Sequence, residues 1–172
     1  MNIKTVVVGD LETNCYILEN DCECLIVDPG ADANKIDSRT DKKVVGIIIT
    51  HGHFDHIGGV SYFCDKYDAP VYDYNNLILG KNQIGGFQFE VIYTPGHTKD
   101  SITIYFPQDK IMFVGDFIFY RTIGRTDLLG GDYEEMKQSI QKIKNYQDIT
   151  LYPGHGIMTK LEEEKIHNIY FR

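Results

Sequence analysis

The chain has 172 residues, of which 42% are apolar and 24% are charged, and its 25 acidic residues against 17 basic ones give a formal net charge of −8. A chain of this length buries roughly 70% of its extended surface on folding, so it can form a hydrophobic core without disulfides and is not disordered. The negative charge argues against a nucleic-acid partner, because non-specific affinity for phosphates comes from Lys and Arg.

Short β-branched and aromatic runs, each closed by Gly, Pro, Asn or Asp, predict strands throughout the chain. In chain order these runs are 3–8, 15–18, 24–27, 44–49, 87–93, 101–106, 111–114 and 149–152. Strands with helices placed between and after them favour a layered α/β or α+β fold. No linker or repeat divides the chain, so we expect one domain over residues 1–172.

Helices are predicted from apolar spacing and capping residues. One is expected at 57–67, and a second at 133–146 behind the capping pair Asp132–Glu135. A third is expected to begin at another capping box, Thr159–Glu162.

The cysteines and the N-terminal residues indicate the compartment. The 4 cysteines do not form the spaced pairs of a zinc knuckle, and we interpret them as reduced, mostly packed thiols. No stretch of 18 apolar residues predicts a membrane span, and the first residues lack the pattern of a secretory signal. We therefore expect a cytoplasmic protein that does not bind or span a membrane.

Three of the 6 histidines lie in residues 50–59, Thr-His-Gly-His-Phe-Asp-His-Ile-Gly-Gly. This HxHxDH motif directly follows the apolar run 44–49, which we expect to be a buried strand that supports the ligands rigidly. Imidazoles and carboxylates are ligands that zinc, iron and manganese prefer. A catalytic tetrahedral zinc takes three protein ligands and keeps one position for water, so four potential ligands in six residues exceed its needs and the motif predicts two metals.

Further ligands must come from elsewhere in the chain. His97 in Thr-Pro-Gly-His, His155 in Tyr-Pro-Gly-His and Asp116 in Val-Gly-Asp each follow a predicted strand, as His51 does. An isolated residue of this kind is usually a turn residue, but beside HxHxDH we interpret all three as ligands. His167 has no such context on the last helix, and we interpret it as a surface or packing histidine.

With these residues the sequence resembles the metallo-β-lactamase superfamily, and within it the short glyoxalase II-like hydrolases. The resemblance covers nearly the whole chain, through the segments 14–16, 27–30, 51–59, 94–98, 115–116, 124–127 and 153–156. It implies an αββα sandwich, in which two mixed β-sheets lie face to face with helices outside. It also implies a dinuclear site at one edge for two divalent metal ions, with zinc favoured and iron or manganese as alternatives.

The resemblance assigns roles residue by residue. It implies that one metal is held by His51, His53 and His97. A second would be held by Asp55, His56 and His155, with Asp116 bridging the two and Asp28 supporting the ligand loop from behind. An ordinary Asp-Pro-Gly turn is the alternative for Asp28.

The resemblance further implies hydrolysis of a small anionic thioester, such as S-lactoylglutathione or another acyl-thiol, by a hydroxide that bridges the metals. Catalysis would then depend on Asp55, Asp116 and, through the ligand loop, Asp28. Arg125 falls where related enzymes carry a basic residue that holds the substrate's carboxylate, and Arg121 is a weaker candidate. A solvated loop arginine is an equal alternative for Arg125 and the favoured interpretation for Arg121.

Two departures from the family leave alternatives open. No added C-terminal helical domain is expected after Tyr152, which puts glutathione recognition in doubt, and Asp100 stands where the family often has Gly. A persulfide dioxygenase with one iron is the nearest alternative. A lactonase or a non-enzymatic metal-binding protein is less favoured, and so is a β-lactamase. We expect a monomer or a small homo-oligomer.

Overall fold

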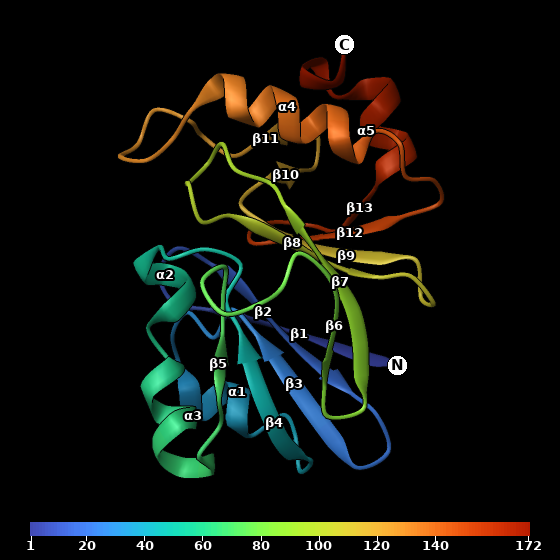
Figure 1. Cartoon of the computed structure of the whole chain (residues 1–172). Helices are drawn as coiled ribbons and strands as arrows, with labels where there is room; N and C mark the ends of the chain where they lie inside the picture. Colours follow the sequence, from blue (N-terminus) through green and yellow to red (C-terminus); the bar gives the residue numbers. More distant parts are fainter.

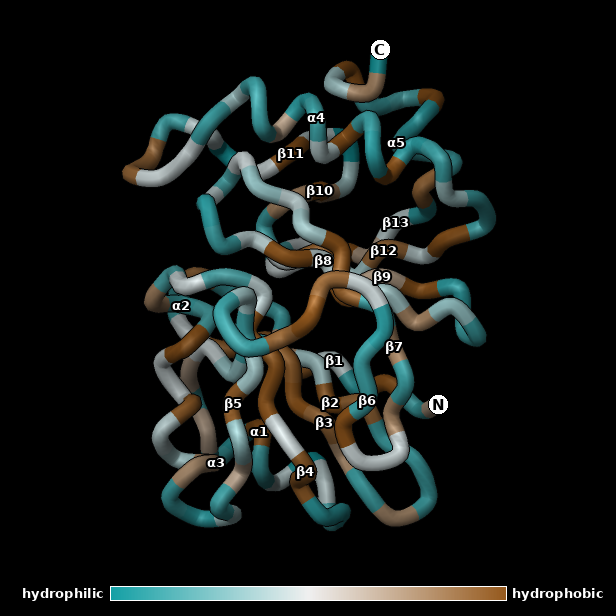
Figure 2. The backbone as a smooth tube through the Cα atoms, viewed as in Figure 1, coloured by the Kyte–Doolittle hydropathy of each residue, from teal (hydrophilic) through white to brown (hydrophobic).

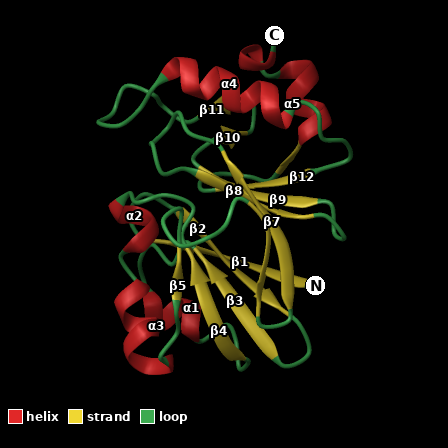
Figure 3. Ribbon diagram, viewed as in Figure 1, coloured by secondary structure: helices red, strands yellow, loops and turns green.

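The computed structural model describes residues 1–172, which form two β-sheets that lie face to face with helices on the outside (Figures 1 and 3). The first sheet has five strands in the order β1-β2-β3-β4-β5, and β3, β4 and β5 run parallel to one another. Its strands are β1 (Asn2–Val8), β2 (Thr13–Glu19), β3 (Glu23–Val27), β4 (Lys43–Ile48) and β5 (Val71–Tyr72). This arrangement confirms the expected αββα sandwich.

The second sheet has six strands in the order β13-β12-β9-β8-β7-β6, antiparallel except for the parallel pair of β12 and β9. Its strands are β6 (Gly80–Ile84), β7 (Phe87–Tyr93), β8 (Ile102–Phe106), β9 (Ile111–Gly115), β12 (Thr150–Pro153) and β13 (Thr159–Lys160). A separate small hairpin consists of β10 (Ile118–Phe119) and β11 (Thr122–Ile123).

The helices form two outer layers. Those beside the first sheet are α1 (Ala33–Asp37), α2 (Phe54–Ile57) and α3 (Val60–Tyr67), and those over the second are α4 (Tyr133–Ile143), α5 (Leu161–His167) and the 3-10 turn η1 (Ile169–Phe171) (Figure 1). The predicted cap of α4 is confirmed, because the Asp132 carboxylate accepts a hydrogen bond from the Glu135 backbone N–H. None of these helices is long and apolar enough to cross a membrane.

Two predicted helices differ from the structure. The helix expected at 57–67 is split into α2 and α3 because Gly58 and Gly59 pack against the chain before α1. The Gly59 N–H donates to the Pro29 carbonyl at 2.7 Å, and a Cβ on Gly58 would lie 2.3 Å from the Gly30 oxygen. The capping box predicted at Thr159 is wrong. Thr159 belongs to β13, and its hydroxyl donates to Glu164 instead.

The hydrophobic core has three parts, which explains why the strands read as continuous apolar runs. Every residue of β2 is buried, because Tyr16 and Leu18 face the second sheet while Cys15 and Ile17 face the helices beside the first. A third cluster packs α4 and α5 against the second sheet. Figure 2 shows the hydrophobic segments concentrated along these central strands and the hydrophilic ones in the outer loops.

Candidate metal centre

The ligand candidates lie on loops that leave the strands at one end of the sandwich. His51 to His56 follow β4 of the first sheet, whereas His97 follows β7, Asp116 follows β9 and His155 follows β12 of the second. The two sheets are tied together here by an isolated bridge between Thr13 and His155. The structure thus brings together all seven residues that the sequence singled out, although His51 and His155 are 104 positions apart in the chain.

The first group consists of His51, His53 and His97, whose ring nitrogens lie within 4.8 Å of one another. Nδ1 of His53 is 3.1 Å from Nε2 of His51 and 2.9 Å from Nε2 of His97. His51 and His97 are buried, and His53 is half-buried at the solvent side of the group.

The second group consists of Asp55, His56 and His155, again within 4.8 Å. Oδ2 of Asp55 lies 3.2 Å from Nε2 of His155 and 3.6 Å from Nε2 of His56. The Thr13 hydroxyl donates to the same Asp55 oxygen at 3.1 Å, which fixes the carboxylate.

Asp116 lies between the two groups. Its Oδ1 is 3.3 Å from Nε2 of His56, and its Oδ2 is 3.5 Å from Nε2 of His97 and 3.6 Å from Nε2 of His155. One carboxylate therefore faces imidazoles of both groups, which is the position a bridging ligand needs.

The outer nitrogen of three imidazoles is held by an acceptor. Nδ1 of His97 donates to the Arg125 carbonyl at 2.7 Å, and Nδ1 of His155 donates to the Leu11 carbonyl at 2.9 Å. Nδ1 of His56 donates to the Asp28 carboxylate at 2.9 Å. Such contacts place the proton on Nδ1 and turn the lone pair of Nε2 toward the centre, as metal-ligating histidines require.

Asp28 supports the ligand loop through more than one contact. Besides His56, its buried carboxylate accepts hydrogen bonds from the Thr50 N–H at 2.8 Å and from the Thr50 hydroxyl at 2.6 Å. Asp28 has a φ of 51°, a conformation that costs energy in a non-glycine residue. Asp28 therefore adopts a turn conformation and also holds the ligand loop through its carboxylate.

The cluster is electrostatically coupled. Burial alone would lower the pKa of His56, but the carboxylates of Asp28 and Asp116 outweigh it and raise that pKa to about 10. Burial would raise the pKa of Asp116, but the neighbouring His56 imidazole, whose Nε2 lies 3.3 Å from Oδ1, lowers it to about 2. Burial and the neighbouring His56 hold the pKa of His51 well below its usual range. Carboxylates and imidazoles here balance one another's charge.

The residues present fit divalent metal ions. Nε2 of His56 and Oδ1 of Asp116 are both buried without a hydrogen-bond partner. Unsatisfied buried polar atoms are costly, and a metal cation that replaces the proton on Nε2 of His56 would contact both atoms and satisfy them. The backbone is also shaped for this arrangement, because a Cβ on Gly154 would lie 2.2 Å from Oδ1 of Asp116.

Two polar contacts that the sequence did not assign hold the ligand loops. The Asp100 carboxylate accepts a hydrogen bond from the Gly52 N–H at 2.9 Å, between His51 and His53. The Asn14 side-chain amide donates to the carbonyls of Pro153 at 3.0 Å and Gly156 at 2.9 Å, on both sides of His155. Single-sequence patterns carry no signal for such pairs, because the partners are far apart in the chain.

The arginine candidates differ in position. Arg125 lies at the edge of the cluster, where its guanidinium donates two hydrogen bonds, both 2.8 Å long, to the Asp127 carboxylate. Arg121 lies at the turn of the β10–β11 hairpin and is directed to α5, where its guanidinium is 3.5 Å from Glu163. His167 is exposed on α5, and all four cysteines are free.

A cleft of about 480 Å³ opens above the cluster. Its floor contains ligand candidates from both groups, and its walls are apolar except for Arg125. The apolar wall residues are Leu11, Phe54, Phe119 and Leu128. Sequence reasoning missed them, because single apolar residues on four separate segments have no distinguishing pattern.

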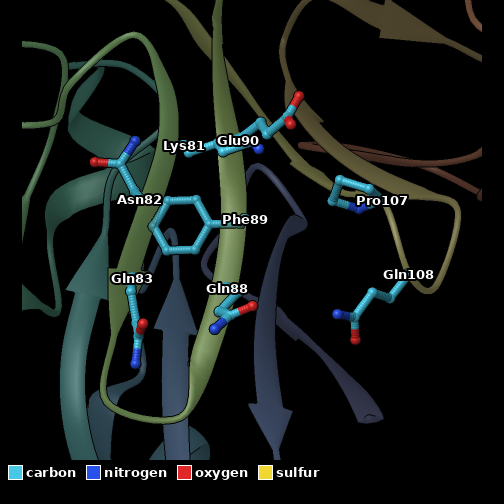
Figure 4. Close-up of a pocket in the computed structure, with 8 residues that line it drawn as sticks. All are labelled: Lys81, Asn82, Gln83, Gln88, Phe89, Glu90, Pro107 and Gln108. Atoms are coloured by element: carbon cyan, nitrogen blue, oxygen red, sulfur yellow. The ribbon is translucent and has the colours of Figure 1, made fainter.

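A larger cleft of about 590 Å³ lies elsewhere, along β6 and β7 and beside the turn after β8 (Figure 4). Phe89 is its one apolar lining residue, and the other seven include no histidine and no cysteine. This cleft therefore lacks the groups that the metal-ligand cluster has.

Comparison with known proteins identifies the family. Residues 8–78 and 73–155 match the Metallo-beta-lactamase superfamily. The chain is 33% identical over 203 residues to the Probable metallo-hydrolase YqgX of Bacillus subtilis, covering 98% of this chain and 96% of that protein. It is 29% identical over 205 residues to the hydroxyacylglutathione hydrolase GloC of Haemophilus influenzae, covering 98% of this chain and 97% of that protein.

Solved structures show the same fold. BLEG-1 B3 metallo-beta-lactamase superimposes with a TM-score of 0.92 at 32% identity, covering 99% of both chains. TTHA1623 in a di-iron-bound form superimposes with a TM-score of 0.89 at 27% identity, covering 97% of this chain and 99% of that chain. The chain therefore belongs to the metallo-β-lactamase superfamily, and its His and Asp cluster lies at one end of the sandwich.

Proposed function

We propose that this protein is a metal-dependent hydrolase that cleaves an acyl thioester. The observation that carries the proposal is the pair of three-residue ligand groups joined by Asp116 at the floor of an open cleft. Structural metal sites are usually closed and rich in Cys, whereas this one is open and contains carboxylates. The relatives named as metallo-hydrolase and hydroxyacylglutathione hydrolase support the same activity.

In this proposal His51, His53 and His97 hold one divalent ion, and Asp55, His56 and His155 hold a second, with Asp116 shared. When bound, such ions lower the pKa of water to about 7 and polarise a carbonyl oxygen. Zinc is the favoured metal, and iron is an alternative supported by the di-iron neighbour.

The chain's own residues prepare the site for this chemistry. Asp28, Thr13 and the carbonyls of Leu11 and Arg125 fix the ligands, so the site does not reorganise when substrate arrives. Asp55 and Asp116 hold two negative charges at the floor, which offsets the charge of the ions. A thiolate leaves without much help from a proton donor, and this suits a thioester.

Arg125 is the one basic side chain other than histidine in the cleft, and we propose that it meets a substrate carboxylate. Its guanidinium already forms two hydrogen bonds with Asp127, so a substrate carboxylate would meet the remaining Nη1 donors and a positive charge that Asp127 partly offsets. Arg121 is held at α5 and is outside the cleft lining, so we do not retain it in the proposal.

The test is metal content per chain, measured on protein purified without added metal, beside hydrolysis of S-lactoylglutathione and O2 uptake with glutathione persulfide. We expect two metals per chain, hydrolysis and no O2 uptake. One iron with O2 uptake would instead identify a persulfide dioxygenase. A β-lactam assayed on the same sample separates the thioesterase from the activity in the name of BLEG-1.

A further inference from the structure

Exposed apolar side chains gather at the mouth of the cleft. Phe54 is 74% exposed, Leu11 is 54% exposed and Leu128 is 38% exposed, and Phe119 is half-buried beside them. They come from four separate segments, which are the β1–β2 turn, the first turn of α2, β10 and the loop before α4. Further exposed apolar residues, Leu129, Ile157 and Met158, are adjacent in the chain to Leu128 and to the His155 loop.

This concentration calls for an explanation. Single exposed apolar residues are normal, but a set drawn from several loops around one cleft marks a binding surface. The same cleft contains the ligand candidates His53, Asp55 and Asp116 as its floor. Whatever occupies the apolar walls therefore also reaches the reacting centre, which identifies the occupant as the substrate and not as a protein partner.

Charge in the walls points the same way. Apart from the ligand candidates, Arg125 is the one ionisable residue that lines the cleft, and Asp127 pairs with one edge of its guanidinium, through Nε and Nη2. The walls therefore provide one cation, already paired with Asp127, for the two carboxylates of a molecule such as glutathione. They offer apolar area instead, which favours an apolar group next to the reacting carbonyl.

We propose that the substrate's acyl group is apolar, so that the protein prefers an alkanoyl or aryl thioester over a hydroxyacyl one such as a lactoyl thioester. This inference rests on the proposed function, since it names the substrate class of the same site. Leu11, Phe54, Phe119 and Leu128 contact the acyl group, and the floor holds the carbonyl to be hydrolysed.

The first experiment varies the acyl group on a constant thiol. Zinc-loaded protein is given S-acetyl-, S-propionyl-, S-hexanoyl- and S-lactoylglutathione, and kcat/KM is measured for each. We expect kcat/KM to rise about twofold to threefold for each added methylene, and propionyl to exceed lactoyl, which differs from it by one hydroxyl. Values that stay level or fall with chain length, or a faster lactoyl thioester, would overturn the inference.

Matched variants locate the effect in the cleft. Leu11→Asn and Leu128→Asn keep the side-chain shape and remove its apolar character. We expect each to lower the hexanoyl-to-acetyl ratio of kcat/KM by about threefold to tenfold. Leu79→Asn is the control, because Leu79 is 56% exposed, like Leu11, but does not line the cleft. An equal drop in the control, or none in Leu11→Asn and Leu128→Asn, would contradict the assignment.

A binding measurement separates this inference from the proposed function. S-hexylglutathione and S-methylglutathione are thioethers that cannot be hydrolysed, and their affinities are measured by calorimetry on the protein as purified. We expect the hexyl compound to bind about tenfold or more tightly than the methyl compound. Tighter hexyl binding without hydrolysis of any thioester would refute the function and support the apolar cleft. Hydrolysis of thioesters together with equal affinities for the two thioethers would support the function and overturn the apolar cleft.

Discussion

At the scale of single residues, the centre depends on side chains whose contacts leave them no other orientation. His53 has no hydrogen bond outside the cluster, and its Nδ1 approaches both His51 and His97. We predict that His53→Ala lowers the metal content and reduces thioester hydrolysis by about 100-fold or more, because three ligands become two.

Elemental analysis and initial rates on the same sample test this prediction. His167→Ala is the control, since His167 is exposed on α5 and far from the cluster in the fold. A His53→Ala variant with full metal content and full rate would remove this residue from the ligand set.

Asp100 positions the ligand loop through one hydrogen bond to the Gly52 N–H. We predict that Asp100→Ala weakens metal affinity about tenfold, because contacts behind metal ligands typically contribute that much. Asp100→Asn keeps an acceptor oxygen and should retain most of the affinity. Competition against a chelator measures both, and equal affinities for the two variants would show that the hydrogen bond has no such role.

The charge of Arg125 is offset by an ion pair with Asp127. We predict that Asp127→Asn lowers the KM for S-lactoylglutathione by up to about fivefold, because it frees a guanidinium for the substrate carboxylate at a solvent-exposed site. The rate constant kcat should change little. Michaelis curves for the two proteins provide the measurement, and an unchanged KM would mean that Arg125 does not meet the substrate.

At the scale of secondary-structure elements, α5 anchors the segment that carries part of the cleft wall. The buried Glu164 carboxylate accepts hydrogen bonds from the Arg121 N–H at 2.9 Å, the Thr159 hydroxyl at 2.7 Å and the Asn168 amide at 2.9 Å. These contacts join the helix to the β10–β11 hairpin and to β13. The hairpin includes Phe119, so the helix contributes indirectly to the shape of the cleft.

We predict that Glu164→Ala lowers the free energy of unfolding by about 2 to 4 kcal/mol, because three buried donors lose their acceptor. Denaturation monitored by circular dichroism measures the change. Glu163→Ala is the adjacent control, since Glu163 is exposed and its carboxylate has only long contacts, 3.5 Å to Arg121 and 3.8 Å to His167. Similar stabilities for the two variants would contradict the role of Glu164.

At the scale of the whole molecule, the proposed ligands connect the two sheets. His51 to His56 belong to the first sheet's loops, and His97, Asp116 and His155 belong to the second. A metal bound by these residues would therefore link the two halves as well as prepare the site. A ligand that binds only the folded state stabilises it by about 2.7 kcal/mol when its concentration is a hundred times its dissociation constant.

We predict that the midpoint of thermal unfolding falls by several degrees when the metal is chelated and recovers when zinc is added back. Scanning calorimetry of the zinc-loaded and chelated protein gives the measurement. An identical midpoint in both states would mean that the metal does not connect the halves. His53→Ala should show a smaller shift than the unaltered chain.

The sequence by itself determined the central strands, α4 and the ligand candidates. Apolar runs such as 44–49 and the HxHxDH spacing are local, so one stretch of chain carries the whole signal. His97, Asp116 and His155 each come directly after a predicted strand, as His51 does. This shared position extended the prediction to all seven ligand candidates. The αββα sandwich itself came from the resemblance and is confirmed.

Only the tertiary structure decided the contacts between distant segments. The short strands β5, β6, β10, β11 and β13 are held by their neighbours and not by their own apolar pattern. The split at Gly58 and the position of Thr159 depend on packing against other elements. The pairing of Asp100 with Gly52 and the apolar cleft walls also join residues that the chain keeps apart. Local propensity cannot encode such contacts, because they exist only once the two sheets have packed together.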